Sequence, residues 1–213
     1  MASLEHAGIE ADEASSASTG GAPEQPSTEE ITEPPKKRKM PHTVEEKIKA
    51  AQDFKEKGNE FFKAKDFKKA ITQYARVFAY TTGLSAQSGM EQYHSAAGRR
   101  DPTHEEKASI QQLQISAWSN SAICHLKLKQ GVKALELLEK VLEKDPKNGK
   151  ALCNKGRALI LIKDLDKAKE CLTASAVLYP NDVLIRKELA KLPALMQAAK
   201  DKEKALWHKA FNK

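Results

Sequence analysis

The sequence predicts an all-α protein in which three helix pairs stack in a right-handed superhelix, a C-terminal helix caps the stack, and a disordered tail comes first. Two observations predict this architecture. Small and large apolar residues recur in one register at three places, and the second and third places lie 34 residues apart without a gap. Residues 1–35, in contrast, contain no aromatic residue, lysine or arginine, and such a segment cannot offset the entropy of ordering.

The three places share six positions of one repeating unit. These are the fourth, eighth, eleventh, twentieth, twenty-fourth and twenty-seventh positions of the unit. In the first unit, which starts at Ala51, they hold Phe54, Gly58, Phe61, Ala70, Tyr74 and Val77. In the second, which starts at Ile115, they hold Trp118, Ala122, His125, Ala134, Leu138 and Val141, and in the third, which starts at Gly149, they hold Leu152, Gly156, Leu159, Ala168, Leu172 and Ser175. This is the pattern of the tetratricopeptide repeat, a helix–turn–helix unit of 34 residues. Three matches in one register disfavour unrelated amphipathic helices. We expect core positions at Trp118, Leu138, Leu152 and Leu172.

The repeats should cover about 51–84, 115–148 and 149–182 within a domain 44–181, with an insertion, 82–110, between the first two. Thr43 is a candidate N-cap for the first helix, with Glu46 as its capping-box partner. The expected helices are Val44–Lys63, Asp66 to about Tyr80, one starting near Pro102 or Thr103, Val132–Lys144, Lys150–Ile162 and Leu165–Leu178. Long loops without secondary structure are usually functional or disordered, so we expect a mobile loop in the insertion.

Residues 182–213 should form the capping helix. Pro180 ends the helix before it, and Asp182 can cap the new one. Apolar residues then recur along one side, and they should cover the open end of the third unit, as repeat arrays require. Pro193 lies inside this pattern, so a kink or a restart is expected there.

Charge and targeting signals give a prediction for location. The formal net charge is +7, and residues 1–35 carry eight acidic groups, so the remainder carries +15. The run of residues 36–39 (Lys-Lys-Arg-Lys), near the end of the 1–43 tail, resembles a nuclear-import signal, and the alternative is a solvated charge run that marks the start of the folded part. No segment has signal-peptide or membrane-span character. We expect a cytoplasmic protein, with the nucleus left open.

No catalytic constellation, phosphate loop or metal-ligand spacing is present in the sequence. The three cysteines, Cys124, Cys153 and Cys171, fall inside predicted helices at spacings that match no zinc or redox motif, which favours buried free thiols. We therefore expect no enzyme activity, no cofactor and no metal.

Five polar residues are candidates for a binding groove. The first helix of each pair lines the concave side of such a stack. Lys55 and Asn59 lie one turn apart on the first helix, Asn120 lies on the third, and Lys150 and Asn154 lie one turn apart on the fifth. Ammonium and amide groups converging on one groove suit the carboxylate of a peptide terminus. The alternative is that they are solvated surface groups.

Three segments resemble the dicarboxylate clamp of co-chaperones: Lys55-Glu56-Lys57-Gly58-Asn59, Ser119-Asn120-Ser121-Ala122 and Gly149-Lys150-Ala151-Leu152. That clamp holds the C-terminal Glu-Glu-Val-Asp of the ninety- and seventy-kilodalton heat-shock chaperones. The resemblance implies that Lys55, Asn59 and Asn120 hold the terminal carboxylate and Lys150 the last aspartate. The family's fifth position is usually arginine, whereas this chain has Asn154, which lacks the charge and the planar fork. Lys155 follows Asn154 but points about 100° away around the helix, so it does not replace the arginine. Asn154→Arg should then strengthen binding to a peptide that ends in aspartate.

Over residues 47–213 the chain looks most like the tetratricopeptide repeat protein nine family, which is related to the repeat halves of FK-type immunophilins. The resemblance rests on the long insertion and on the closing run from Lys202 to Phe211. It implies an adaptor that docks acidic C termini of heat-shock chaperones, without isomerase activity. Two alternatives stay open: a general scaffold with an unused clamp, and a basic nuclear protein that binds nucleic acid. The mixed lysine and asparagine groove disfavours the latter.

Overall fold

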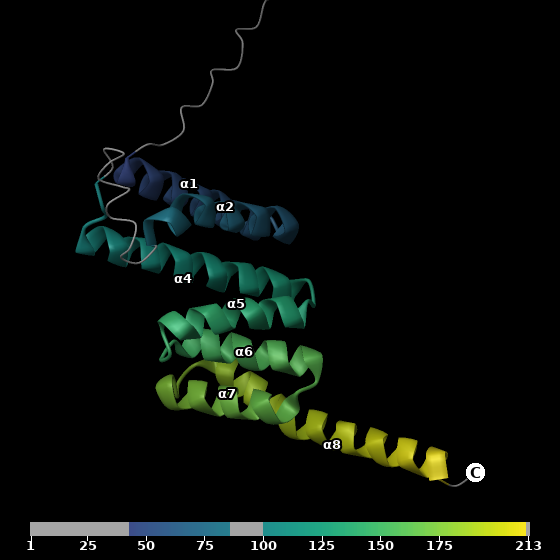
Figure 1. Cartoon of the computed structure of the whole chain (residues 1–213). Coiled ribbons are helices and arrows are strands. Elements are labelled where there is room, and N and C mark those ends of the chain that lie inside the picture. Colours follow the sequence, from purple (N-terminus) through teal and green to yellow (C-terminus); the bar gives the residue numbers. More distant parts are fainter. Residues whose placement is uncertain (1–42, 86–99, 212–213) are drawn as a thin grey trace, which may run out of the picture. The chain divides into compact units, whose positions relative to one another are not determined.

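The computed structural model describes residues 43–85 and 100–211, and these ranges form seven helices (Figure 1). The helices are α1 (Val44–Lys63), α2 (Phe67–Ser85), α4 (His104–Lys127), α5 (Gly131–Lys144), α6 (Gly149–Ile162), α7 (Leu165–Leu178) and α8 (Val183–Phe211). The described residues contain no strand, which confirms the all-α prediction. The predicted disordered tail, the basic run 36–39 and residues 86–99 of the predicted insertion lie outside the described residues.

The helices pack in chain order as three pairs. α1 packs on α2, α4 on α5, and α6 on α7, while α2 packs on α4, α5 on α6, and α7 on α8 (Figure 1). Weaker contacts join α1 to α4 and α4 to α6, the first helices of successive pairs. This is the arrangement that the recurring register predicts.

Local capping signals set the starts of two helices, of which the one at Thr43 was predicted. The Thr43 hydroxyl accepts a 3.2 Å hydrogen bond from the Glu46 amide, and the Glu46 carboxylate accepts one from the Thr43 amide. Thr103 and Glu106 form the same capping box at the start of α4. Each box satisfies amide donors that the first helical turn leaves without partners.

The end of α2 differs from the prediction, which stopped the helix near Tyr80. The helix continues to Ser85, because Thr81 is fully buried and its hydroxyl accepts a 3.2 Å hydrogen bond from Gln114 on α4. Both ends of the predicted insertion 82–110 are therefore helical. A buried polar pair carries no apolar periodicity, which is why the sequence pattern ends too early.

The core forms where large residues meet small ones across each pair. Leu138 and Leu172 are fully buried as predicted, whereas Trp118 and Leu152 are only half-buried. Trp118 instead stacks on Phe78, with ring centroids 5.0 Å apart. All three cysteines are free; Cys124 and Cys153 are buried as expected, but Cys171 is half-buried.

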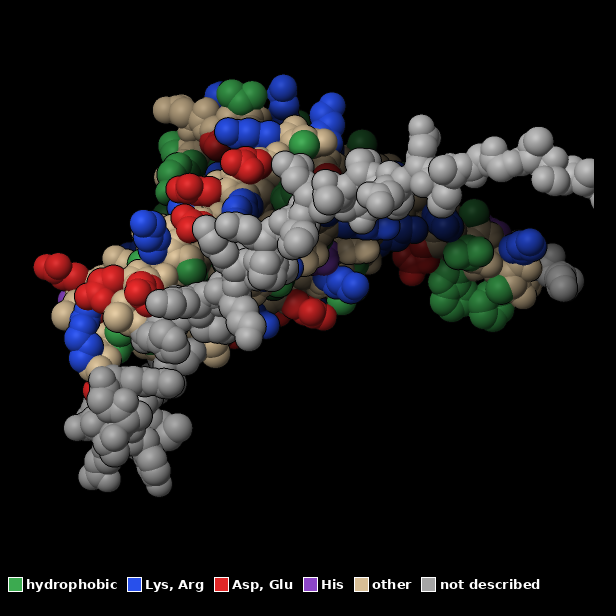
Figure 2. All heavy atoms as spheres, turned by 90° about the horizontal axis from the view of Figure 1, so that it is seen from above, with side chains coloured by type: hydrophobic (Ala, Val, Ile, Leu, Met, Phe, Trp, Pro, Cys, Tyr) green, Lys and Arg blue, Asp and Glu red, His purple; other side chains and the backbone are tan. Residues whose placement is uncertain are grey.

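α8 caps the stack with only its first part. Asp182 accepts hydrogen bonds from the Leu184 and Ile185 amides, which confirms it as the capping residue. Ile185 and Leu192 are buried against α7, and the helix continues through Pro193 without the restart that the sequence allows. Residues 197–211 are all exposed, and their apolar side chains gather at the end of α8 (Figure 2). None of the described helices is long and apolar enough to cross a membrane.

Candidate functional site

The five candidate residues lie on α1, α4 and α6, the first helices of the three pairs. Lys55 and Asn59 are on α1, Asn120 is on α4, and Lys150 and Asn154 are on α6. Because α4 contacts both of the others, the three helices can contribute to one surface. The structure places these residues in two groups, one around Asn59 and one around a pocket beside α6.

The first group is centred on Asn59. Its side-chain Oδ1 accepts a 2.9 Å hydrogen bond from the Tyr74 hydroxyl and a 3.1 Å hydrogen bond from Asn120 Nδ2. Two donors on one oxygen use both of its lone pairs and fix the orientation of the amide. The Asn59 Nδ2 group, with two N–H donors, must then point away from them.

Tyr74 supports this amide from inside the first pair. Its ring is buried, and it lies against Gly58, where a Cβ atom would overlap the ring. Burial raises the pKa of the Tyr74 hydroxyl to about 12, so the group stays protonated and donates at neutral pH. Lys55 is half-buried one turn before Asn59, and no ion pair to it occurs among the described residues.

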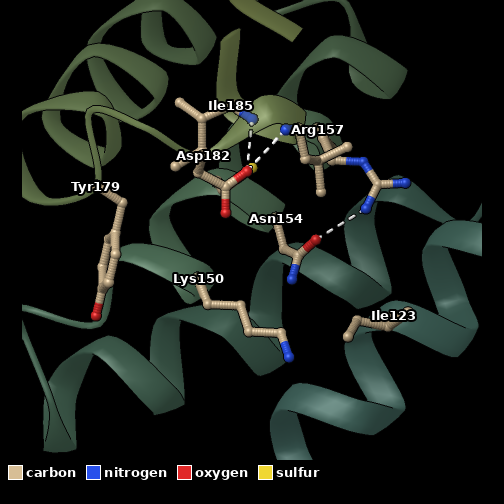
Figure 3. Close-up of a pocket in the computed structure, with 9 residues that line it drawn as sticks. Ile123, Lys150, Asn154, Arg157, Tyr179, Asp182 and Ile185 are labelled. Carbon is tan, nitrogen blue, oxygen red and sulfur yellow. Dashed lines mark hydrogen bonds between the residues drawn. The ribbon is translucent and has the colours of Figure 1, made fainter. Parts of the chain in front are cut away.

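The second group lines a pocket of about 530 Å³ beside α6 (Figure 3). Its lining residues come from α4, from α6, from the segment between α7 and α8 and from the start of α8: Ile123, Lys150, Cys153, Asn154, Arg157, Tyr179, Asp182, Leu184 and Ile185. Lys150 is exposed at this pocket. The pocket thus combines an apolar wall with two cations, one amide and one carboxylate.

Asn154 is held by a residue that the sequence reasoning missed. Asn154 is only 4% exposed, and its Oδ1 accepts a 2.9 Å hydrogen bond from Arg157 Nη1. In Figure 3 the Asn154 amide nitrogen is turned away from Arg157, toward the side on which Lys150 lies. Lys155, as expected, faces elsewhere and pairs with Glu139 at 3.4 Å.

A signal for Arg157 was present in the sequence. Residues three and four apart share a helix face, so Asn154 and Arg157 are neighbours, whereas Asn154 and Lys155 are not. The Tyr74 hydroxyl was missed for a different reason. The register marks Tyr74 as a packing residue, and only the tertiary structure shows that its oxygen reaches Asn59.

Two observations on residues 43–85 and 100–211 concern metal binding and the reactivity of one cysteine. No group of three or more histidine, cysteine, aspartate and glutamate residues there is placed to hold a metal ion. Burial raises the pKa of the Cys153 thiol to about 11, so this cysteine in the pocket is a neutral thiol and a poor nucleophile at neutral pH.

Comparison with known proteins gives a consistent family. The sequence profile of the tetratricopeptide repeat matches residues 122–192. Peptidyl-prolyl cis-trans isomerase FKBP4 of Rattus norvegicus is 28% identical over 169 residues, which is 79% of this chain and 34% of the relative. The chain therefore spans about a third of the length of the curated relatives that it matches.

Solved structures share the fold. The C-terminal TPR-containing domain of a Plasmodium falciparum FK506-binding protein is 30% identical, with a TM-score of 0.64, over 75% of this chain and 97% of that domain. The first TPR of Spaghetti (RPAP3), bound to the HSP90 peptide SRMEEVD, is 19% identical, with a TM-score of 0.53, over 70% of this chain and 95% of that one. At that identity the second likeness concerns the fold alone.

Proposed function

Because this chain belongs to the tetratricopeptide repeat family, we propose that it is a non-enzymatic cytoplasmic adaptor whose groove binds peptides ending in a free carboxylate. The partners would be acidic C-terminal peptides of heat-shock chaperones, in the manner of a co-chaperone. Lys55, Asn59 and Asn120 would hold the terminal carboxylate, and Lys150 and Asn154 the last acidic side chain.

The orientation of Asn59 is the observation that carries the proposal. Since its Oδ1 already accepts from Tyr74 and Asn120, the Asn59 side chain has only its Nδ2 donors left to offer a ligand. The ammonium of Lys55 lies on the same helix face one turn away. Amide and ammonium donors on one face favour an anion, and a charge-assisted hydrogen bond contributes roughly 1.5–3 kcal/mol.

The chemistry of a known ligand supports the choice of peptide. The TPR domain of RPAP3 has the same fold and binds an HSP90 peptide that ends in Glu-Glu-Val-Asp. A peptide of that sequence presents a terminal carboxylate and an acidic side chain on its last residue. The two groups of residues described above offer separate places for these two anions.

The test is calorimetric titration of Met-Glu-Glu-Val-Asp, as free acid and as C-terminal amide, against wild type and Lys55→Ala. Wild type should bind the free acid with roughly micromolar Kd. Lys55→Ala should weaken this about ten- to a hundred-fold, because it removes a charge-assisted contact of roughly 1.5–3 kcal/mol. The amide should bind wild type similarly weakly, because it lacks the terminal charge.

Lys57→Ala is the matched control, because Lys57 is exposed and lies about 200° around α1 from Lys55. It should leave the affinity unchanged. Equal binding of the acid and the amide by wild type, or no effect of Lys55→Ala, would contradict the proposal and favour a scaffold with an unused clamp.

A further inference from the structure

The pocket beside α6 contains a guanidinium that the clamp pattern does not include. Lys150, Asn154 and Arg157 follow at spacings of four and three residues, so they share one face of the helix. All three line the same pocket. In this chain the arginine lies one turn further along α6 than the position where the co-chaperone pattern places it.

The contacts of Arg157 leave part of its fork available. Nη1 donates to Asn154 Oδ1 at 2.9 Å, and Nε lies 3.8 Å from Glu188 Oε1 on α8. At 3.8 Å, Arg157 and Glu188 form an ion pair but no hydrogen bond. Among the described residues no partner of Nη2 occurs, and about a quarter of the Arg157 side chain is exposed. A guanidinium has five donors, so several remain for a ligand.

The surrounding charges favour an anion at this place. Glu188 cannot fully neutralise Arg157, because the same carboxylate also pairs with Lys191 at 3.1 Å. Asp182 is the acidic group of the pocket itself, and it already accepts from the Leu184 and Ile185 amides. With Lys150 and Arg157 on the pocket wall, cations outnumber carboxylates there.

Asn154 completes the arrangement. Its oxygen is occupied by Arg157, so its nitrogen faces the pocket as a donor, on the side of Lys150 (Figure 3). A buried amide that accepts from a guanidinium also limits the rotamers of that guanidinium. Asn154 therefore both donates toward the pocket and positions Arg157.

We propose that Arg157, positioned by Asn154, supplies the guanidinium that pairs with the acidic side chain of the last peptide residue. This inference rests on the proposed function, because it assigns a specificity-determining residue to the same groove. A guanidinium can hold a carboxylate through two parallel hydrogen bonds, which neither an ammonium nor an amide can do. The usual arginine position then holds Asn154, and Arg157, three residues later, supplies the guanidinium instead.

A comparison of two free-acid peptides tests this assignment, one ending in Asp (Met-Glu-Glu-Val-Asp) and one ending in Asn (Met-Glu-Glu-Val-Asn). Wild type should bind the first at least about tenfold more tightly, because only that peptide has a carboxylate on the side chain of its last residue. Arg157→Gln should reduce this preference severalfold, with the remainder supplied by Lys150, and should leave the Asn peptide nearly unaffected. Arg157→Lys should keep part of it, because the charge remains but the fork is lost.

Two control variants separate binding from structure. Glu188→Gln breaks the same α6–α8 ion pair as Arg157→Gln but keeps the guanidinium, so it should retain the preference. Lys155→Gln removes one positive charge from the same helix outside the pocket, and it should also retain the preference. If Arg157→Gln is poorly folded, Arg157→Lys with these two controls still gives the comparison.

The outcomes distinguish the two proposals. If wild type requires the free terminal carboxylate and Lys55, but Arg157→Gln keeps the full preference for the Asp peptide, the role of Arg157 is wrong and the proposed function stands. The role is also wrong if the controls lose the preference as Arg157→Gln does. If wild type binds neither peptide, both proposals fall together.

Discussion

Asn120 Nδ2 donates a 3.1 Å hydrogen bond to Asn59 Oδ1, which joins α4 to α1 across 61 residues of sequence. The bond makes two candidate groove residues dependent on each other. Asn120 orients the Asn59 amide, and the Tyr74 hydroxyl donates a second hydrogen bond to the same Asn59 oxygen. The groove is thus held by side chains from both helices of the first pair and from the first helix of the second.

Asn120→Asp should test this coupling directly. The change is nearly isosteric, but it removes the donor to Asn59 and places a carboxylate beside the site proposed for the peptide terminus. We expect affinity for free-acid Met-Glu-Glu-Val-Asp to fall more than about tenfold, because like charges repel and a hydrogen bond is lost. Calorimetric titration measures it. Gln112→Glu, which adds the same charge at an exposed position of α4, should bind normally; an unchanged Asn120→Asp variant would exclude Asn120 from the site.

Asn154→Arg should not behave as the clamp pattern alone suggests. Asn154 is 4% exposed and already bonded to Arg157, so a second guanidinium would be forced into a packed site beside the first. We expect a loss of stability of about 1–3 kcal/mol instead of tighter binding, since overpacking and like charges both oppose the change.

Thermal unfolding and titration on the same samples check this expectation. The double variant with Arg157→Gln should recover part of the lost melting temperature, because it removes the like charge. A single Asn154→Arg variant with an unchanged melting temperature and tighter binding would show that the pocket accommodates both arginines.

Gly58→Ala should destabilise the first helix pair. An added Cβ would overlap the Tyr74 ring, which is 1% exposed. We expect a cost of about 1–3 kcal/mol, or several degrees in Tm for a chain of this size. Differential scanning calorimetry measures this, with Lys57→Ala as a surface control expected within about 0.5 kcal/mol of wild type. Equal Tm values for the two variants would mean that the ring relaxes freely.

Arg100 should make stability depend on acid pH. Its guanidinium donates to both oxygens of Glu106 at 2.8 and 2.7 Å and also contacts Glu45 at the start of α1. The hydrogen bonds from Arg100, and then the amide of Thr103, lower the pKa of Glu106 from 4.5 to about 2. Because the folded pKa is the lower one, the stabilisation is complete above the unfolded value and is lost as the pH falls toward about 2.

Arg100→Gln should therefore cost stability near neutral pH and little near pH 2, which flattens the acid limb of the stability profile. Urea unfolding across that range gives the profile. Lys107→Gln removes the same charge from an exposed position of α4 and should keep the wild-type slope. Parallel profiles for wild type and Arg100→Gln would assign the acid dependence to other carboxylates.

The sequence by itself determined the features that depend on neighbours within a turn or two. Apolar spacing predicted the bounds of α1 and α7 and placed five polar candidates on three particular helices. Capping chemistry identified Thr43 and Asp182, because an N-cap bonds to amides only two or three residues away. These signals are local, so they can be read without knowing which helices later meet.

Only the tertiary structure decided how side chains from distant segments share their hydrogen bonds. The orientation of the Asn59 amide depends on Asn120, and the length of α2 depends on Gln114. Arg157 is the clearest case. Its spacing from Asn154 was visible in the sequence, but its place in the pocket depends on Glu188, contributed by a helix that packs there only after folding.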